Sequence, residues 1–374
     1  MTAANNGFAF RLLKQLAKDQ PAANIFVSPY SAATVLQMAG DGAAGKTKTE
    51  MQQVLGTAGM SSDAVMVAHK SIAKALNAGD TNITLITANA LWYQAGTPVK
   101  PEFVTRNRQF FCSTVDALDF TDPHSAEVIN AWADEKTWGK ISRIADGMVD
   151  PVYTRLFLAN AVYFKGKWSE PFKPKDTSDQ PFHLRDGRLK SVPMMSQSRV
   201  FTYRRGAGYQ AVRLPYEGEN LAMYVFLPDT NSSPEELLGI LNGDRWQRVT
   251  KPGFDEKDGL VKLPKFKLEY GVDLKGPLRA MGMKAAFESK QADFSGIAPK
   301  LYVSAALQKT FVEVKEEGTE AAAVTGMALT SAGPEIPRPE PFIMIVDRPF
   351  LFLIEDNWTK TILFMGLMFD PQAG

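Results

Sequence analysis

The sequence predicts an α+β fold in one integrated domain over residues 1–374. Stretches with the 3.6-residue apolar spacing of amphipathic helices alternate along the chain with β-rich apolar runs. No repeat, linker-like change of composition or charged block divides it. With 45% hydrophobic residues the chain can bury a large core, so we expect one domain rather than the two that its length alone suggests.

Capping signals and apolar periodicity predict the elements. Ser28 and Ser233 each precede a proline, which predicts two helix starts, because a serine oxygen accepts a first-turn N–H and proline has none to leave unpaired. Predicted helices span residues 8–16, 28–39, 47–55, 61–78, 101–110, 128–137, 234–241 and 272–281. Predicted strands span 24–27, 82–94, 154–164, 262–269 and 303–314, with several strands between 182 and 228 and a hairpin of 350–354 with 362–366.

Charge and composition exclude several function classes. The 42 basic and 41 acidic residues leave a net charge of +1, so no field favours nucleic acid or an anionic membrane. No stretch approaches the ~20 apolar residues of a membrane helix. The first residues lack the basic and then apolar pattern of a signal peptide, so we expect none in this chain. One cysteine excludes an internal disulfide.

Gly40–Thr47 satisfies the pattern of a phosphate-binding loop. Such a loop must follow a strand, so that its amides and the next helix converge on the phosphate. Residues 31–39 instead carry a helical pattern, and we interpret the motif as a turn between two helices.

Other chemical motifs are absent from the sequence. The three histidines have no zinc-ligand spacing, and no nucleophile with a base is recognisable, so we expect no metal, no cofactor and no enzymatic activity. Cys112 follows two phenylalanines and is interpreted as a buried, inert thiol. Core packing is expected for Trp132, Trp138, Trp168 and Trp246.

The segment Glu316–Ala332 is poised between two structures. After Gly318 come more than a dozen small or apolar residues with one charge and no proline, followed by Pro334, Pro337, Pro339 and Pro341. In a strand, Thr319, Ala321, Ala323, Thr325, Met327 and Leu329 would share one face that is fit for a core. The segment can therefore be an exposed loop that also fits as a buried strand. The alternative interpretations are a permanent strand and an alanine-rich linker.

A series of short motifs along the chain carries a family resemblance. They are Asn24–Ser31, Asn130–Ile141, Leu158–Trp168, Leu214–Tyr216, Leu263–Phe266, Ala292–Gly296, Glu316–Ala322 and Arg348–Phe350. Both the residues of these motifs and the order in which they follow one another resemble those of the serpins, and the resemblance covers nearly the whole chain. The resemblance implies three β-sheets, eight or nine helices and an exposed reactive-centre loop at about 316–345.

The resemblance also implies an inhibitor that traps a serine protease as a covalent acyl-enzyme, by inserting its cleaved loop into the large sheet. A non-inhibitory carrier or chaperone is the alternative, and the small residues of the hinge favour inhibition. It implies a monomer with loop-sheet polymerisation possible, and an extracellular location with any signal peptide absent from this chain; a cytoplasmic location is the alternative. Residues 61–77 lack the basic cluster of heparin-activated members, so no polysaccharide cofactor is expected.

Three groups of site residues follow from the resemblance. The shutter under the large sheet comprises Ser28, Ser31, Asn160 and Gln308, where Gln308 replaces a histidine common in the family. The breach at the top of the sheet comprises Lys265, Glu316 and Trp168. The hinge comprises Glu316, Gly318, Thr319, Glu320, Ala321, Ala322 and Ala323.

The reactive bond can be placed by counting forward from Gly318 or backward from Pro349. The usual hinge length after Gly318 gives Ala332-Gly333, whereas a short distal loop before Pro349 gives Arg338-Pro339. The first is preferred, because the second would bring prolines toward a central strand. Small residues there predict an elastase-like or subtilisin-like target. The alternative reactive residues are Leu329, Thr330, Ser331 and Arg338.

Overall fold

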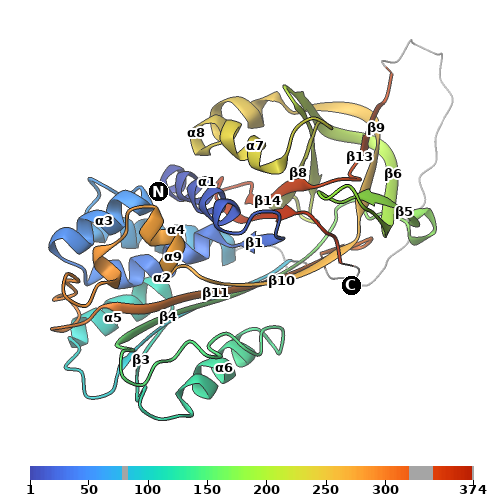
Figure 1. Ribbon diagram of the computed structural model, residues 1–374. Helices are drawn as coiled ribbons and strands as arrows, with labels where there is room; N and C mark the ends of the chain where they lie inside the picture. The colour runs from blue at the N-terminus through green and yellow to red at the C-terminus, as the bar shows by residue number, and fades with distance from the viewer. Residues whose placement is uncertain (78–82, 320–339, 373–374) are drawn as a thin grey trace.

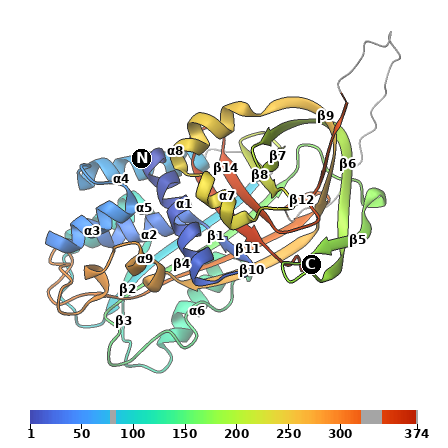
Figure 2. The same cartoon turned by 45° about the horizontal axis from the view of Figure 1, so that its top comes forward.

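The computed structural model describes residues 1–77, 83–319 and 340–372. Two β-sheets form its centre (Figures 1 and 2). In the described part of the chain the helices are α1 (Thr2–Asp19), α2 (Pro29–Asp41), α3 (Gly45–Leu55), α4 (Ser62–Asn77), α5 (Pro101–Phe111), α6 (Ser125–Lys136), α7 (Pro234–Ile240), α8 (Gly243–Arg245) and α9 (Lys275–Ala280), and a π-helix, η2 (Trp246–Thr250), follows α8.

The six-stranded sheet lies between α6 on one face and the group of α2, α3, α4 and α5 on the other (Figure 1). Its strands, in spatial order, are β10 (Phe266–Asp273), β11 (Val303–Lys315), β12 (Gly318–Thr319), β4 (Leu156–Lys167), β2 (Ile83–Gln94) and β3 (Thr114–Leu118). β11 also pairs directly with β4, in parallel. This sheet carries the candidate site.

The nine-stranded sheet pairs a strand near the N-terminus with the last strand of the described chain. In spatial order it comprises β1 (Ile25–Val27), β15 (Ile362–Met368), β14 (Phe350–Asp356), β8 (Leu221–Pro228), β7 (Tyr209–Pro215), β6 (Leu189–Gly206), β9 (Asp255–Pro264) and β13 (Phe342–Ile345), with β5 (Ser178–His183) on β6. The 18-residue β6 pairs with β7 at one end and β9 along its middle. It therefore joins the two smaller expected sheets into one hydrogen-bonded network, and the α+β fold class is confirmed.

Three predictions of local structure are wrong, and two strands were missed. Residues 262–269 form parts of β9 and β10 in different sheets, because the chain leaves one sheet at Pro264 and enters the other at Phe266. β3 and β13 were not predicted. Trp138 is 69% exposed, in a left-handed turn after α6. Cys112 is exposed, because its left-handed backbone turns it away from α5.

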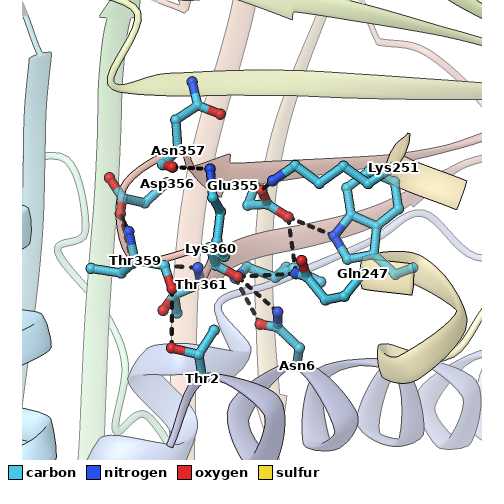
Figure 3. Close-up of polar contacts among 12 residues, drawn as sticks. Thr2, Asn6, Gln247, Lys251, Glu355, Asp356, Asn357, Thr359, Lys360 and Thr361 are labelled. Atoms are coloured by element: carbon cyan, nitrogen blue, oxygen red, sulfur yellow. Dashed lines mark hydrogen bonds and ion pairs between the residues drawn. The ribbon is translucent and has the colours of Figure 1, made fainter. Parts of the chain in front are cut away.

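A polar cluster fixes the first helix against the last hairpin (Figure 3). Asn6 of α1 donates to the Lys360 carbonyl at 2.8 Å and accepts from the Ile362 amide at 2.9 Å.

The fully buried Glu355 pairs with Lys251 and accepts from Trp246 Nε1. Every partner of that carboxylate is a donor, which offsets part of the cost of burying its charge. No helix in the described ranges is long and apolar enough to cross a membrane.

Candidate functional site: the seam between β4 and β11

The strands β4 and β11 form a seam that opens at one end. They pair from Val303 with Leu156 to Phe311 with Tyr163. Beyond that pair they separate, and β12 lies between them, pairing antiparallel with both. Two hinge residues, Gly318 and Thr319, thus lie between the two strands at the open, upper end of the seam; we call these two residues the wedge.

The wedge residue Thr319 points into the core. Its side chain is fully buried, and its hydroxyl lies 2.9 Å from that of Tyr216. Tyr216 stacks on Trp168, with ring centroids 4.6 Å apart. Burial raises the pKa of Tyr216, so the phenol stays neutral, and either hydroxyl can donate the hydrogen bond between Tyr216 and Thr319. Thr319 is the first residue of the face predicted to be apolar and inward.

Gly318 fits the wedge because it has no side chain. Its φ is +146°, and a Cβ atom there would lie 2.3 Å from the Gly166 oxygen and 2.6 Å from the Lys167 Cα. Both contacts are to backbone that is held in β4. Only glycine allows the chain to pass this close.

The residues predicted as the breach meet directly above the wedge. Glu316, 6% exposed, pairs with Lys265 Nζ at 2.9 Å and accepts from the Thr177 hydroxyl at 2.9 Å. Burial opposes ionisation of Glu316, but the hydrogen bonds from Lys265 and Thr177 outweigh it and hold the pKa of its carboxyl below the usual value. Trp168 Nε1 donates to the Lys315 carbonyl at 3.0 Å. The turn between β11 and β12 is therefore fixed by charge and by hydrogen bonds.

The residues predicted as the shutter form one buried network near the middle of the seam, three pairs below Tyr163 and Phe311. Gln308 of β11 exchanges two 2.9 Å hydrogen bonds with the Ser28 backbone and donates to Asn160 Oδ1 of β4 at 2.6 Å. Asn160 Nδ2 donates to Ser31 Oγ at 2.7 Å and to Asn89 Oδ1 at 2.8 Å. The amide of Gln308 uses both its donor and its acceptor, so the network survives without a histidine.

Comparison with known proteins identifies the family. The profile described as "Serpin (serine protease inhibitor)" matches residues 3–371. This chain belongs to the serpin family. It is 37% identical to the leukocyte elastase inhibitor of Bos taurus over 99% of both chains. Native protease nexin-1, solved with heparin, superposes with a TM-score of 0.87 at 33% identity, covering 99% of this chain and 98% of that one. Thyroxine-binding globulin, solved with thyroxine, gives a TM-score of 0.87 at 26% identity, covering 100% and 99%.

Several predicted residues of this serpin lie outside the described ranges. They are Glu320, Ala321, Ala322, Ala323, Leu329, Thr330, Ser331, Ala332, Gly333 and Arg338. Of the predicted loop 316–345, the described ends are β12 and β13, and β13 pairs at the edge of the nine-stranded sheet. An edge position suits a strand that follows Pro341 directly, because the proline has no N–H to offer.

The structure also shows where the sequence motifs lie that were rejected as phosphate-binding or metal-binding sites. Gly40–Thr47 joins α2 to α3 and follows a helix, as predicted. A Cβ at Gly42 would lie 2.2 Å from Ile297, so packing against that residue explains the glycine. His69 is buried, and burial lowers its pKa to about 3. Among the described residues, no group of His, Cys, Asp or Glu could hold a metal ion.

The sequence missed three partners in the site. Asn89, Thr177 and Tyr216 each contact a predicted site residue through a buried or part-buried hydrogen bond. Tyr216 lies in the Leu214–Tyr216 motif, which is the one signal that could have pointed to it. Asn89 and Thr177 carry no motif; the register of β2 on β4 places Asn89 beside Asn160, and the loop before β5 places Thr177 beside Glu316.

Proposed function

We propose that this serpin is an inhibitor that traps a serine protease of elastase-like or subtilisin-like specificity by inserting its cleaved loop between β4 and β11. The observation that carries the proposal is the wedge. The hinge residues Gly318 and Thr319 already pair with both strands, while the strands still pair with each other from Tyr163 and Phe311 downward. This is the arrangement of a sheet ready to accept one more strand.

The register of the wedge supports the same conclusion. Thr319 pairs with Gly166 and Val314, so continued antiparallel pairing would bring Ala322 to the level of Tyr163 and Phe311. The odd-numbered residues from Thr319 would then face the core, which is the predicted apolar face. Ala321, Ala322 and Ala323 have side chains small enough to enter the sheet without displacing its neighbours, and the one charge, Glu320, would face outward.

Insertion would also release free energy. A new central strand satisfies backbone groups on both sides and buries an apolar face, at roughly 25 cal/mol per Å² of apolar area. In the proposed mechanism this free energy carries the acylated protease away from the loop before the ester is hydrolysed.

The test is to mix the chain with pancreatic elastase or subtilisin and to analyse the products by SDS gel and mass spectrometry. We expect an SDS-resistant species whose mass is the sum of the two proteins less the fragment released by acylation, which begins at Gly333. Elastase whose catalytic serine is replaced by alanine is the matched control and should give no such species. Complete cleavage with full residual protease activity would contradict the proposal and favour the carrier or chaperone alternative.

A further inference from the structure

We propose that Lys140 is the residue that holds the seam between β4 and β11 closed and so sets how fast a strand can enter it. This inference rests on the proposed function, and it concerns the opposite face of the sheet from the shutter. There the segment after α6, residues 137–143, crosses the seam and is tied to both strands; we call it the strap.

Lys140 bridges the two strands through their aromatic side chains. Its Nζ lies 5.6 Å from the ring centroid of Tyr163 on β4 and 5.8 Å from that of Phe311 on β11. The two rings are 6.1 Å apart, and both residues are buried. Both distances are within the range of attraction between a cation and an aromatic face. One ammonium therefore contacts both sides of the seam.

The position of this contact is what gives it a function. Tyr163 and Phe311 are the last direct pair of β4 and β11 before the strands separate around β12. A strand that extends the wedge must first part these two rings. Their separation takes at least one of them away from Lys140, so the contact opposes the first step of insertion.

The strap holds Lys140 in place. The fully buried Thr137 donates from Oγ1 to the Ala133 carbonyl at 2.7 Å and accepts from the Ile141 amide at 2.9 Å. Ile141 is itself fully buried under α6. On the β11 side, Lys309 Nζ donates to the Arg143 carbonyl at 2.6 Å. Lys140 is thus held on both flanks, by α6 on one side and by β11 on the other.

The chain offers a matched control. Lys267 lies over the same Phe311 ring, 5.5 Å from its centroid, but it comes from β10. β10 is the neighbour of β11 on the side away from the seam. Its contact is of the same kind and distance but does not cross the seam.

The experiment measures uptake of a synthetic peptide with the sequence of residues 319–330, as a mobility change on native gels. Lys140→Met should take up the peptide about three to ten times faster than wild type, which corresponds to about 0.7–1.4 kcal/mol at the barrier. Lys140→Arg keeps the cation and should restore the wild-type rate within about twofold, and Lys267→Met should not change it. Equal rates for Lys140→Met, Lys267→Met and a wild type that does take up the peptide would overturn the inference.

Amide hydrogen exchange separates this inference from the proposed function, because it needs neither peptide nor protease. Exchange in β4 and β11 near Tyr163 and Phe311 should be faster in Lys140→Met than in Lys267→Met. If wild type takes up no peptide but this difference in exchange is present, the proposed insertion fails and the role of Lys140 stands. The same exchange in both variants would refute the role of Lys140.

Discussion

If this serpin inhibits by insertion as proposed, replacing Gly318 with alanine should displace the wedge and make the chain a substrate instead of an inhibitor. The new methyl group would lie 2.3 Å from the Gly166 oxygen, 2.6 Å from the Lys167 Cα and 2.8 Å from the Trp168 nitrogen. All three are backbone atoms, which cannot rotate away as a side chain could. Overpacking of this kind costs about 1–3 kcal/mol. A side chain at a φ of +146° adds about 1–3 kcal/mol.

The sum, about 2–6 kcal/mol, is as large as the net contribution of the few hydrogen bonds of a two-residue strand, at about 0.5–1.5 kcal/mol each, so β12 should be displaced from the seam. Without the wedge, insertion must begin from closed strands and should lose the race against hydrolysis of the acyl-enzyme. We therefore expect the number of inhibitor molecules consumed per protease inactivated to rise severalfold in Gly318→Ala, measured by titration of residual elastase activity.

Gly271→Ala is the matched control. Gly271 lies in β10 of the same sheet, and a Cβ there would meet only Lys309 Cγ, at 3.9 Å. This variant should inhibit as wild type does. The reasoning fails if Gly318→Ala also keeps the wild-type stoichiometry and melting temperature.

Three further predictions concern the hinge, a buried histidine and the reactive bond. Thr319→Arg places a charge where Thr319 meets Tyr216 in the core, which costs several kcal/mol, so the loop should be cut while the protease stays active; inhibition at the wild-type level would show that the inward face is misassigned. His69 is neutral in the folded state because burial lowers its pKa to about 3, whereas it protonates near 6.5 in the unfolded chain. The contribution of neutral His69 to the free energy of unfolding is therefore present above pH 6.5 and is lost as the pH falls, by about 2 kcal/mol at pH 5. His69→Leu should remove this part of the acid destabilisation in urea unfolding, and an unchanged pH profile would refute it. Ala332→Arg should gain trypsin inhibition while Arg338→Ala leaves elastase inhibition intact; the reverse would place the reactive bond at Arg338.

The sequence predicted most elements of the fold, because their periodicity is local. The break at Lys265 was not predicted, although the sequence carries a signal for it. The apolar residues of this stretch are Leu263 and then Phe266 and Leu268, so the period of two residues shifts its phase across Pro264 and Lys265. The periodicity still does not tell to which sheet each half belongs. The break nevertheless positions the breach, since it leaves Lys265 between two strands and beside Glu316.

The candidate site was predictable where a motif marked it. Asn160 and Gln308 were assigned through the family resemblance, and the structure brings them to 2.6 Å. The strap was not predictable, because it depends on which side chains from three separate elements meet over the seam. No spacing in the sequence relates Lys140 to Tyr163 and Phe311.

The shutter predicts how insertion should end. Continued pairing of β12 would bring Thr325 between Asn160 and Gln308, on the core face, where the direct hydrogen bond of 2.6 Å must break. A buried amide left without a partner costs about 1–3 kcal/mol. The Thr325 hydroxyl can accept from Gln308 and donate to Asn160, so it would replace the lost contact.

Thr325→Val keeps the shape of the side chain but removes the hydroxyl, and Thr325→Ser keeps the hydroxyl. We therefore expect the cleaved Thr325→Val form to melt at a lower temperature than cleaved wild type, while the uncleaved forms melt alike. The serine variant should match wild type in both states. A cleaved valine variant that is as stable as cleaved wild type would show that insertion stops before it reaches the shutter, or that it follows another register.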